Sequence, residues 1–424
     1  MAKILILNER IKYKQKEWFM DKEDQKLINY IDNNKEEICA LVRKLVSIPS
    51  VNIPGEKEGQ QLEIGNFIYK KFQEIGLNNV RFQDVYPGAK NVLGETLASS
   101  KKTGIIFNGH MDTVNVNNMK IDPFMGSVID GKIYGRGTAD MKSGLAAAIF
   151  AVKAILDLNI NLSKGIFLTA VVDEESSGRG INKLISEGIK AEYGIVGEPT
   201  CYGGRLKIAI AHKGRAEMEV TVKGKASHGC APELGINAIS RMCEVIQAIE
   251  KELPKKLSLN THSLLGTGTI NVGVINGGTQ SNIVPDTCTI KIDRRILPGE
   301  DLEDVQNEIE DILEKLRKKD SKLNVSVKPT KNSLLRRAQP MEISPDEKIA
   351  KMASLAIEQV TGTPGLIWGS PGYTDASPMV NKAKIPTIVL GPGRVGHTQD
   401  EHVHIDEVIT CTKVYALIMK SICK

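Results

Sequence analysis

The sequence lacks the features that mark several large classes of protein. Its seven cysteines are odd in number and widely spaced, and no C-x-x-C pair occurs, which argues against a disulfide framework and against a cysteine zinc site. No stretch approaches the roughly 18 apolar residues of a membrane-spanning helix, and the N-terminus has no signal-peptide pattern. We therefore expect a cytoplasmic protein that does not contact membranes.

A strong excess of either charge is also missing. The chain has 56 basic and 51 acidic residues, a net charge of +5, and a pI of about 8.6. A nucleic-acid-binding protein usually concentrates its basic residues on one face and has a pI above about 9. Two basic stretches, residues 3–16 and 315–322, are typical of a solvated tail and a solvated helix end. We expect no nucleic-acid partner.

What the sequence does contain is alternation of helix and strand. The apolar fraction of 41% and the length of 424 residues suit a globular protein of two or three domains. Apolar strands follow amphipathic helices repeatedly in the first 200 residues, which indicates an α/β fold with a largely parallel sheet covered on both faces. The expected helices are 21–46, 62–75 and 143–158, and the expected strands are 80–85, 91–97, 104–109, 165–172 and 193–197.

From about residue 213 the pattern changes. Apolar and polar residues alternate in 217–222, and the elements that follow run in the order β-α-β-β-α-β, which is the split ferredoxin-like unit. Because this unit has the elements of a complete small domain, we predict that it is an insertion. The predicted domains are an N-terminal extension at 1–20, a first domain in two parts at 21–212 and 331–424, and an inserted domain at 213–330.

Potential metal ligands stand where apolar strands end or just before a helix begins. Functional groups of open α/β sheets gather outside the carboxyl ends of the strands. Taken singly, each such residue has a structural alternative; Asp140, for example, is also a good helix N-cap. Together, two imidazoles and three carboxylates suit a pair of divalent ions, zinc first, with cobalt and manganese as alternatives. The residues are His110, Asp140, Glu175, Glu198 and His397.

Further polar residues near these positions bear on the same chemistry. Glu174 and Glu175 are adjacent and point in different directions, so one can coordinate while the other takes a proton from water activated by the metal. Asp112 can accept the second N–H of the His110 imidazole and fix its tautomer. The sequence alone would also allow His402 or His404 in place of His397.

One competing motif points to another class of enzyme. Residues 391–396 follow an apolar strand and read G-P-G-R-V-G, which matches the dinucleotide-binding pattern G-x-G-x-x-G. Too few residues remain for a full βαβ unit with a ribose-binding acid, and the proline removes a backbone N–H that a pyrophosphate would use. The context therefore argues against an oxidoreductase.

Taken together, the motifs resemble those of the M20 family of zinc-dependent peptidases and deacylases, especially acetylornithine deacetylase and succinyl-diaminopimelate desuccinylase. The resemblance extends from about residue 21 to the C-terminus. It rests on G-H-M-D-T-V at 109–114, G-R-G-T-A-D-M-K-S-G at 135–144, D-E-E at 173–175, G-E-P-T at 197–200 and H-T-Q-D-E at 397–401.

This resemblance implies a zinc-peptidase-like catalytic domain and a role for each matching residue. Glu174 would be the general base, and the peptide bond after Asp140 would be cis. His110, Asp140 and Glu198 would hold one metal ion. Asp140, Glu175 and His397 would hold the other.

The resemblance also implies that the inserted βαββαβ domain is a lid and the surface of a homodimer. His228 would polarise the scissile carbonyl, often in the partner's active site. Asn282 and Arg295 would receive the free carboxylate of the substrate, for which a fixed guanidinium fork is well suited. Gly372 and Thr374 would belong to a substrate-binding loop.

The function that we predict is metal-assisted hydrolysis of the amide bond of an N-acyl amino acid, as in a deacetylase or desuccinylase. A dipeptidase or carboxypeptidase of the same family, acting on short peptides, is the first alternative. A non-catalytic homologue that uses the lid as a binding module is the second, although no expected ligand or base is missing.

Overall fold

The computed structural model describes residues 20–52, 61–117, 119–330 and 338–424. It divides into two compact units. The first comprises residues 1–210, 342–369 and 374–424, and the second comprises 211–341 and 370–373. The N-terminal extension expected at 1–20 lies outside the described residues except for Met20. None of the described helices is long and apolar enough to cross a membrane.

The first unit is built on a ten-stranded mixed sheet. Its strands run in the order β1, β2, β6, β3, β7, β18, β9 and β16, and β8 and β17 also pair with β9. The central strands β6, β3, β7 and β18 are parallel to one another, which confirms the predicted mostly parallel core. The bounds are β1 (Asn78–Tyr86), β2 (Ala89–Glu95), β3 (Thr103–His110), β6 (Gly165–Val171), β7 (Tyr193–Val196), β8 (Cys201–Tyr202), β9 (Arg205–His212), β16 (Met341–Glu342), β17 (Leu366–Ser370) and β18 (Thr387–Val389).

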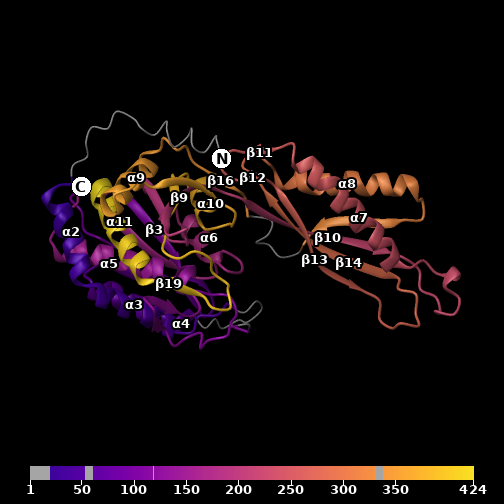
Figure 1. The fold of residues 1–424 in the computed structure, drawn as a ribbon, viewed down its shortest axis with the longest axis horizontal. Helices are drawn as coiled ribbons and strands as arrows, with labels where there is room; N and C mark the ends of the chain where they lie inside the picture. The colour runs from indigo at the N-terminus through magenta and orange to yellow at the C-terminus, as the bar shows by residue number, and fades with distance from the viewer. Residues whose placement is uncertain (1–19, 53–60, 118, 331–337) are drawn as a thin grey trace. The chain divides into compact units, whose positions relative to one another are not determined.

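Helices cover both faces of this sheet. On one face, α5 (Ser143–Asp157) lies beside α11 (Ile405–Cys423) (Figure 1), and Phe107 of β3 meets Tyr415 of α11 edge-on at 5.1 Å between ring centroids. On the other face, Asn108 of β3 donates to Asp375 at the start of α10 (Ala376–Asn381). Alternation along β3 thus directs successive side chains to opposite helix layers.

The sequence predicted one continuous helix over residues 21–46, and this prediction is wrong about its continuity. It is two helices, α2 (Lys22–Asn33) and α3 (Lys35–Ser47), separated by Asn34. The Asn34 side chain donates to the main-chain carbonyl of Tyr30, and such local bonds compete with the helix. The apolar periodicity continues across the break, so it gave no sign of the interruption.

Further helices and a second, small sheet complete the first unit. A small sheet in the order β19–β5–β4 was not predicted, because strands of three residues carry too little periodicity to detect. The remaining bounds are α4 (Gln61–Glu74), α6 (Arg179–Ser186), α9 (Lys348–Thr361), β4 (Ser127–Ile129), β5 (Lys132–Tyr134), β19 (His402–His404) and the irregular turn η1 (Thr138–Lys142).

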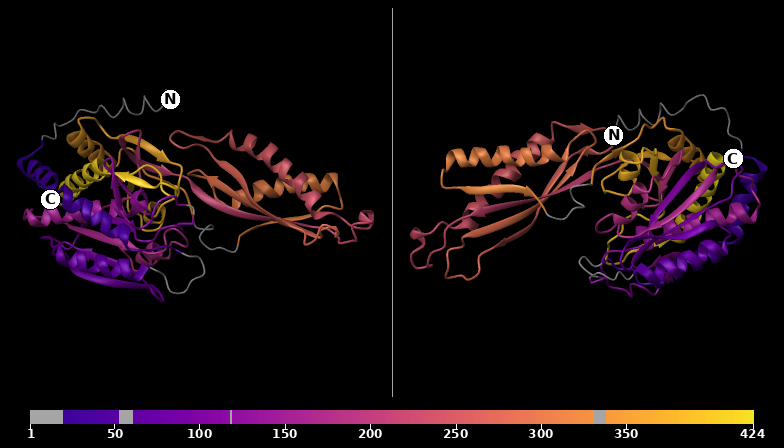
Figure 2. Two further views of the ribbon diagram at one scale, coloured as in Figure 1. Left: turned by 60° about the horizontal axis from the view of Figure 1, so that its bottom comes forward. Right: turned by 180° about the vertical axis from the view of Figure 1, so that it is seen from behind.

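The second unit has a four-stranded antiparallel sheet in the order β13, β14, β10, β15. Helices α7 (Ala238–Leu257) and α8 (Leu302–Lys319) lie on the same side of it (Figure 2). The sequence order β10, α7, β13, β14, α8, β15 is the predicted βαββαβ. The strand bounds are β10 (Gly214–Lys223), β13 (Thr269–Gly277), β14 (Thr287–Ile296) and β15 (Asn324–Pro329), with the short elements η2 (Pro232–Leu234), β11 (Thr261–His262) and β12 (Gly266–Thr267).

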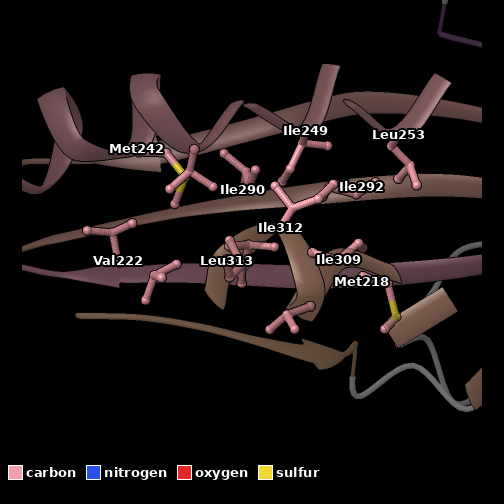
Figure 3. Packing of buried hydrophobic residues seen from close by; sticks show 14 of the residues in the cluster. Met218, Val222, Met242, Ile249, Leu253, Ile290, Ile292, Ile309, Ile312 and Leu313 are labelled. Atoms are coloured by element: carbon pink, nitrogen blue, oxygen red, sulfur yellow. The ribbon is translucent and has the colours of Figure 1, made fainter. Parts of the chain in front are cut away.

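Burial of one face of this sheet stabilises the second unit. Alternate residues of β10 are buried, including Met218 and Val222. Figure 3 shows Ile249 of α7 directed at the sheet beside Ile290 and Ile292 of β14. Each fully buried aliphatic side chain contributes about 1.5–3 kcal/mol of transfer free energy, so the second unit has a substantial core of its own.

Candidate metal centre

The parallel strands bring the predicted ligands to one edge of the sheet. His110 is the last residue of β3, and Glu174 and Glu175 come shortly after β6. Glu198 follows β7 and His397 follows the end of β18. Because these four strands are neighbours and parallel, their carboxyl ends lie side by side.

Asp140 lies between the two histidines. Its Oδ1 is 3.0 Å from His110 Nε2 and its Oδ2 is 3.3 Å from His397 Nε2. Glu198 Oε1 is 3.2 Å from His110 Nε2, and Glu175 Oε1 is 3.0 Å from His397 Nε2. The five side chains therefore form two groups that share Asp140. A carboxylate in that position can bridge two metal ions.

The loop that carries Asp140 is held in place by Glu401, a buried acid that ends the H-T-Q-D-E motif and for which no role was predicted. Glu401 is 1% exposed, and its Oε1 accepts the main-chain N–H groups of Ala139 and Asp140 at 3.0 and 3.2 Å. Its other oxygen is 2.5 Å from the guanidinium of Arg136. The peptide bond between Asp140 and Met141 is cis, as the resemblance implied.

Asp112 does not contact His110 in the way that the sequence predicted. The Nδ1 of His110 hydrogen-bonds to the main-chain carbonyl of Asp112 at 2.9 Å, while the carboxylate is 3.7 Å away. The carboxylate instead accepts the N–H groups of Glu174 and Glu175, at 3.2 and 3.1 Å. A backbone carbonyl is an ordinary partner for a ligating histidine, so the imidazole is still oriented, and the side chain of Asp112 holds the turn after β6.

Glu174 lies in the group around His110. Ligand atoms of His110, Glu174 and Glu198 lie within 4.8 Å of one another, as do those of His110, Asp140 and Glu175. Burial, and the nearby charges of Glu198 and Asp375, raise the pKa of Glu174 well above its usual value. A carboxyl group in this state accepts and releases protons more readily near neutral pH than an exposed glutamate does.

The charges of the other groups show the same crowding of acids. Burial and the charge of Asp140 raise the pKa of Glu198 to about 8. Hydrogen bonds with Asp140 and Glu175 raise the pKa of His397 to about 11. Burial opposes ionisation of Asp140, but its bonds to the two histidines hold its pKa below the usual range. A compact set of mutually repelling acids with two imidazoles has the donor chemistry that divalent cations require.

The glycine-rich stretch at 391–396 is explained by close packing rather than by nucleotide binding. A side chain at Gly396 would collide with Asp140, and one at Gly391 would collide with the main chain of Gly197. Gly393 has a φ of 89° and faces Ala139. The stretch therefore allows the loop that ends at His397 to approach the other ligands.

The alternative ligands His402 and His404 lie in β19. His397 Nε2 lies 3.3 Å from Asp140 and 3.0 Å from Glu175, and within the described residues neither His402 nor His404 contacts either acid. His402 Nδ1 hydrogen-bonds to the carbonyl of Asp400 at 2.8 Å, and its ring packs against Tyr134. The structure therefore favours His397, which the resemblance had also favoured.

The predicted substrate residues are divided between the two units. Thr374 lies in the first unit, is 5% exposed, and accepts the N–H of Ala376. His228, Asn282, Arg295 and Gly372 lie in the second unit. Their roles remain predictions.

Within the second unit, two of these residues are neighbours. Gly229, which follows His228, donates its N–H to the carbonyl of Asn282 at 2.8 Å, and His228 forms a bridge with Ile283. Arg295 donates to Asp293 at 2.8 Å. This ion pair with Asp293 is a structural role for Arg295 that differs from the predicted binding of a carboxylate. The bond uses the Nε–H of the guanidinium group, and its other N–H groups can still donate to a ligand.

Asp375 is a buried acid beside the centre that received no role from the sequence. One of its oxygens accepts the side-chain N–H of Asn108 at 2.9 Å. Burial raises its pKa to about 7. Its position next to Thr374, in the predicted substrate-binding loop, was the only signal that could have drawn attention to it.

The sequence profile of peptidase family M20/M25/M40 matches residues 106–421, which is more than half of the chain. The chain belongs to this family. The metal-dependent, amide-hydrolysing class that the motifs predicted is thereby confirmed.

Individual relatives agree with this assignment. The N-formyl-4-amino-5-aminomethyl-2-methylpyrimidine deformylase of Halalkalibacterium halodurans is 29% identical over 414 residues, which cover 92% of this chain and 95% of that protein. The acetylornithine deacetylase of Buchnera aphidicola is 31% identical over 331 residues, covering 76% and 81%. The structure of aminopeptidase PepT from Bacillus cereus has a TM-score of 0.73 at 27% identity and covers 92% of this chain and 99% of its own.

Proposed function

We propose that this M20 family member is a two-metal deacylase that cleaves the amide bond of a small N-acyl compound, with an N-acyl amino acid as the preferred class. The observation that carries the proposal is the position of Asp140, within 3.3 Å of both His110 and His397. The carboxyl group of Glu174 lies close to the same His110 and to Glu198. The names of the deformylase and deacetylase relatives support cleavage of an acyl group rather than of a peptide.

Each side of Asp140 offers ligands for one ion. His110 and Glu198 stand on one side, and Glu175 and His397 on the other. We propose zinc, because imidazole and carboxylate ligands suit it well. When bound, such a pair lowers the pKa of water and polarises the carbonyl of the substrate.

The proton is moved by Glu174 in this proposal. Glu174 takes a proton from the attacking water and then gives it to the leaving amine, so that the amine departs in neutral form. The main chain of Glu174 is fixed by its hydrogen bond to Asp112. The N–H of the adjacent residue, the proposed ligand Glu175, goes to the other oxygen of the same carboxylate.

The second unit would supply the substrate contacts. We propose that it acts as a lid, with His228 polarising the scissile carbonyl and Asn282 and Arg295 receiving a carboxylate. Within its sheet, β13 pairs with β14 alone among the described strands, and an open edge strand is a ready template for pairing with another copy. This supports the proposed homodimer, which analytical ultracentrifugation would test directly.

A substrate panel separates this function from its alternatives. The zinc-loaded protein is assayed with N-formyl, N-acetyl and N-succinyl amino acids and with dipeptides of the same amino acids. We expect the acyl compounds to be hydrolysed with a higher kcat/KM than the dipeptides. Preference for dipeptides would instead favour a peptidase, for which the likeness to aminopeptidase PepT is the specific observation. Metal binding without any hydrolysis would favour the non-catalytic homologue.

A further inference from the structure

Three residues of the first unit form a cation–aromatic cluster that the proposed mechanism does not use. The ammonium group of Lys207 lies 5.3 Å from the ring centroid of Tyr202 and 5.3 Å from that of Trp368. The two rings touch each other, with centroids 4.8 Å apart and a tilt of 48°. All three side chains are partly exposed, so the cluster is accessible to a small molecule.

Short connections in the fold link this cluster to the metal centre. Tyr202 ends β8, only four residues after the ligand Glu198, and Trp368 lies in β17, which pairs with β9. Cys201, beside Tyr202, donates its N–H to the carbonyl of Gly393 at 2.8 Å. Gly393 in turn packs against Ala139, the neighbour of Asp140.

Electrostatics agree with this placement. Burial raises the pKa of Tyr202, and the charge of Asp140 raises it further. The phenol of Tyr202 is therefore within reach of the field of the bridging carboxylate.

A second cluster in the same chain shows what Lys207 lacks. Lys153 also lies over two aromatic rings, those of Tyr30 and Phe150, each at 5.4 Å. Its ammonium has in addition an ion pair with Asp157 at 2.7 Å. Within the part of the chain that the structure describes, the ammonium of Lys207 has neither an ion pair nor a hydrogen bond to any oxygen.

The two aromatic rings attract the charged ammonium group of Lys207 but do not accept hydrogen bonds from its N–H groups. The negative faces of aromatic rings attract a cation, whereas the three N–H donors of an ammonium group are satisfied only by oxygen or nitrogen acceptors. Lys207 is thus positioned by Tyr202 and Trp368, and its N–H donors, which face water in the free protein, can bind an anion in the way that Lys153 binds Asp157.

We propose that Lys207, held by Tyr202 and Trp368, is a specificity-determining residue that binds a second carboxylate of the substrate, remote from the amide bond that is cleaved. This inference rests on the proposed function and narrows its substrate class to N-acyl compounds with two carboxylates. The second carboxylate belongs either to the acyl group, as in an N-succinyl amino acid, or to an acidic amino-acid side chain.

Matched substrates test this inference through a ratio of rates. The zinc-loaded full-length protein is assayed with N-succinyl and N-acetyl alanine, and with N-acetyl glutamate and N-acetyl glutamine. We expect Lys207→Met to lower kcat/KM about 10- to 100-fold for the substrate whose second carboxylate binds Lys207, because a hydrogen bond to a charged group is lost. The neutral member of that pair should be unaffected, and Lys207→Arg should retain most of the preference.

Lys153→Met is the matched control, because it removes a lysine from an equivalent pair of rings far from any proposed substrate contact. It should leave both ratios unchanged. If Lys207→Met lowers the rates for charged and neutral substrates equally, or lowers neither, the inference is overturned while the proposed function stands.

A binding measurement remains informative even if no amide is hydrolysed. The chain has two tryptophans, so in a Trp18→Phe background the fluorescence reports on Trp368 alone. We expect succinate to change this fluorescence in a saturable manner, and the change to disappear in Lys207→Met. An unchanged response in Lys207→Met, or none in the parent protein, would contradict the assignment of Lys207.

Discussion

Glu401 accepts a hydrogen bond from the main-chain N–H of Asp140 at 3.2 Å. The same carboxylate pairs with Arg136 through its other oxygen. A buried acid thus fixes the backbone of the residue whose two oxygens face the two histidines. The geometry of the proposed bridging ligand therefore depends on a residue other than the two histidines.

Replacing Glu401 should therefore weaken metal binding. In Glu401→Gln, one end of the amide must present N–H groups either to Arg136 or to the main-chain donors, so one contact is lost. Changes to such supporting contacts typically cost about 10- to 100-fold in metal affinity, and we expect a loss of this size in competition with a chelator. Glu187→Gln, on the exposed surface, is the control. Unchanged affinity in Glu401→Gln would show that the Asp140 loop holds its shape without this acid.

The adjacent acids Glu174 and Glu175 should respond differently to the same substitution. Glu174→Gln removes the proposed proton carrier and should lower kcat by several decades, with both metal ions retained. Glu175→Gln removes a proposed ligand and should lower the metal content itself. Activity assays and elemental analysis of the two variants separate the roles. Equal metal loss in both variants would contradict the separation of the two roles. Full activity in Glu174→Gln would contradict the assignment of Glu174 as the proton carrier.

Asp112 is expected to contribute to stability as well as to activity. Its buried carboxylate accepts the N–H groups of Glu174 and Glu175. In Asp112→Asn the amide cannot accept with both of its ends, and a buried donor left unpaired costs about 1–3 kcal/mol. Urea denaturation should show a decrease of that size in the free energy of unfolding. The exposed Asp84→Asn should show almost none, and similar behaviour of the two variants would argue against the contact.

The metal-free protein should show a pH dependence that comes from His397. Asp140 and Glu175 raise the pKa of this imidazole from 6.5 to about 11. Because the folded state binds the proton more tightly, the stabilisation is fully present below about pH 6.5 and is lost as the pH rises toward 11. The difference in free energy of unfolding between the metal-free parent and His397→Gln should therefore shrink steadily from pH 6.5 to 9.

Metal affinity should follow the opposite trend over the same interval, since a ligating histidine must be neutral. Calorimetry in two buffers of different ionisation enthalpy would detect the protons released on zinc binding. A stability difference that grows with pH, or zinc binding without proton release, would contradict the pairing of His397 with the two acids.

Much of the centre was predictable because its residues stand at the ends of strongly apolar strands. His110 ends β3 and Glu198 follows β7, and the apolar character of both strands is evident from the sequence. A parallel arrangement of such strands requires their ends to meet. Glu401 and Asp375 were not predictable in the same way. Their roles depend on contacts across more than 200 residues of sequence, with Asp140 and Asn108 respectively, and no local pattern encodes such contacts.

The same distinction explains the errors in detail. The carboxylate of Asp112 was expected at His110 because the two residues are close in sequence, but the main-chain carbonyl takes that position. The break at Asn34 was missed because apolar periodicity records which face is buried and not whether the helix is continuous. The periodicity of apolar residues therefore predicted the helix and sheet layers and the ends of the strands. It did not predict which atoms form individual hydrogen bonds.

Anomalous X-ray diffraction from zinc-loaded crystals tests the central claim most directly. The account predicts two zinc peaks about 3.5–4 Å apart, one on each side of Asp140, with His110 and Glu198 at one and Glu175 and His397 at the other. A single peak, or zinc bound away from Asp140, would contradict a two-metal centre at these residues.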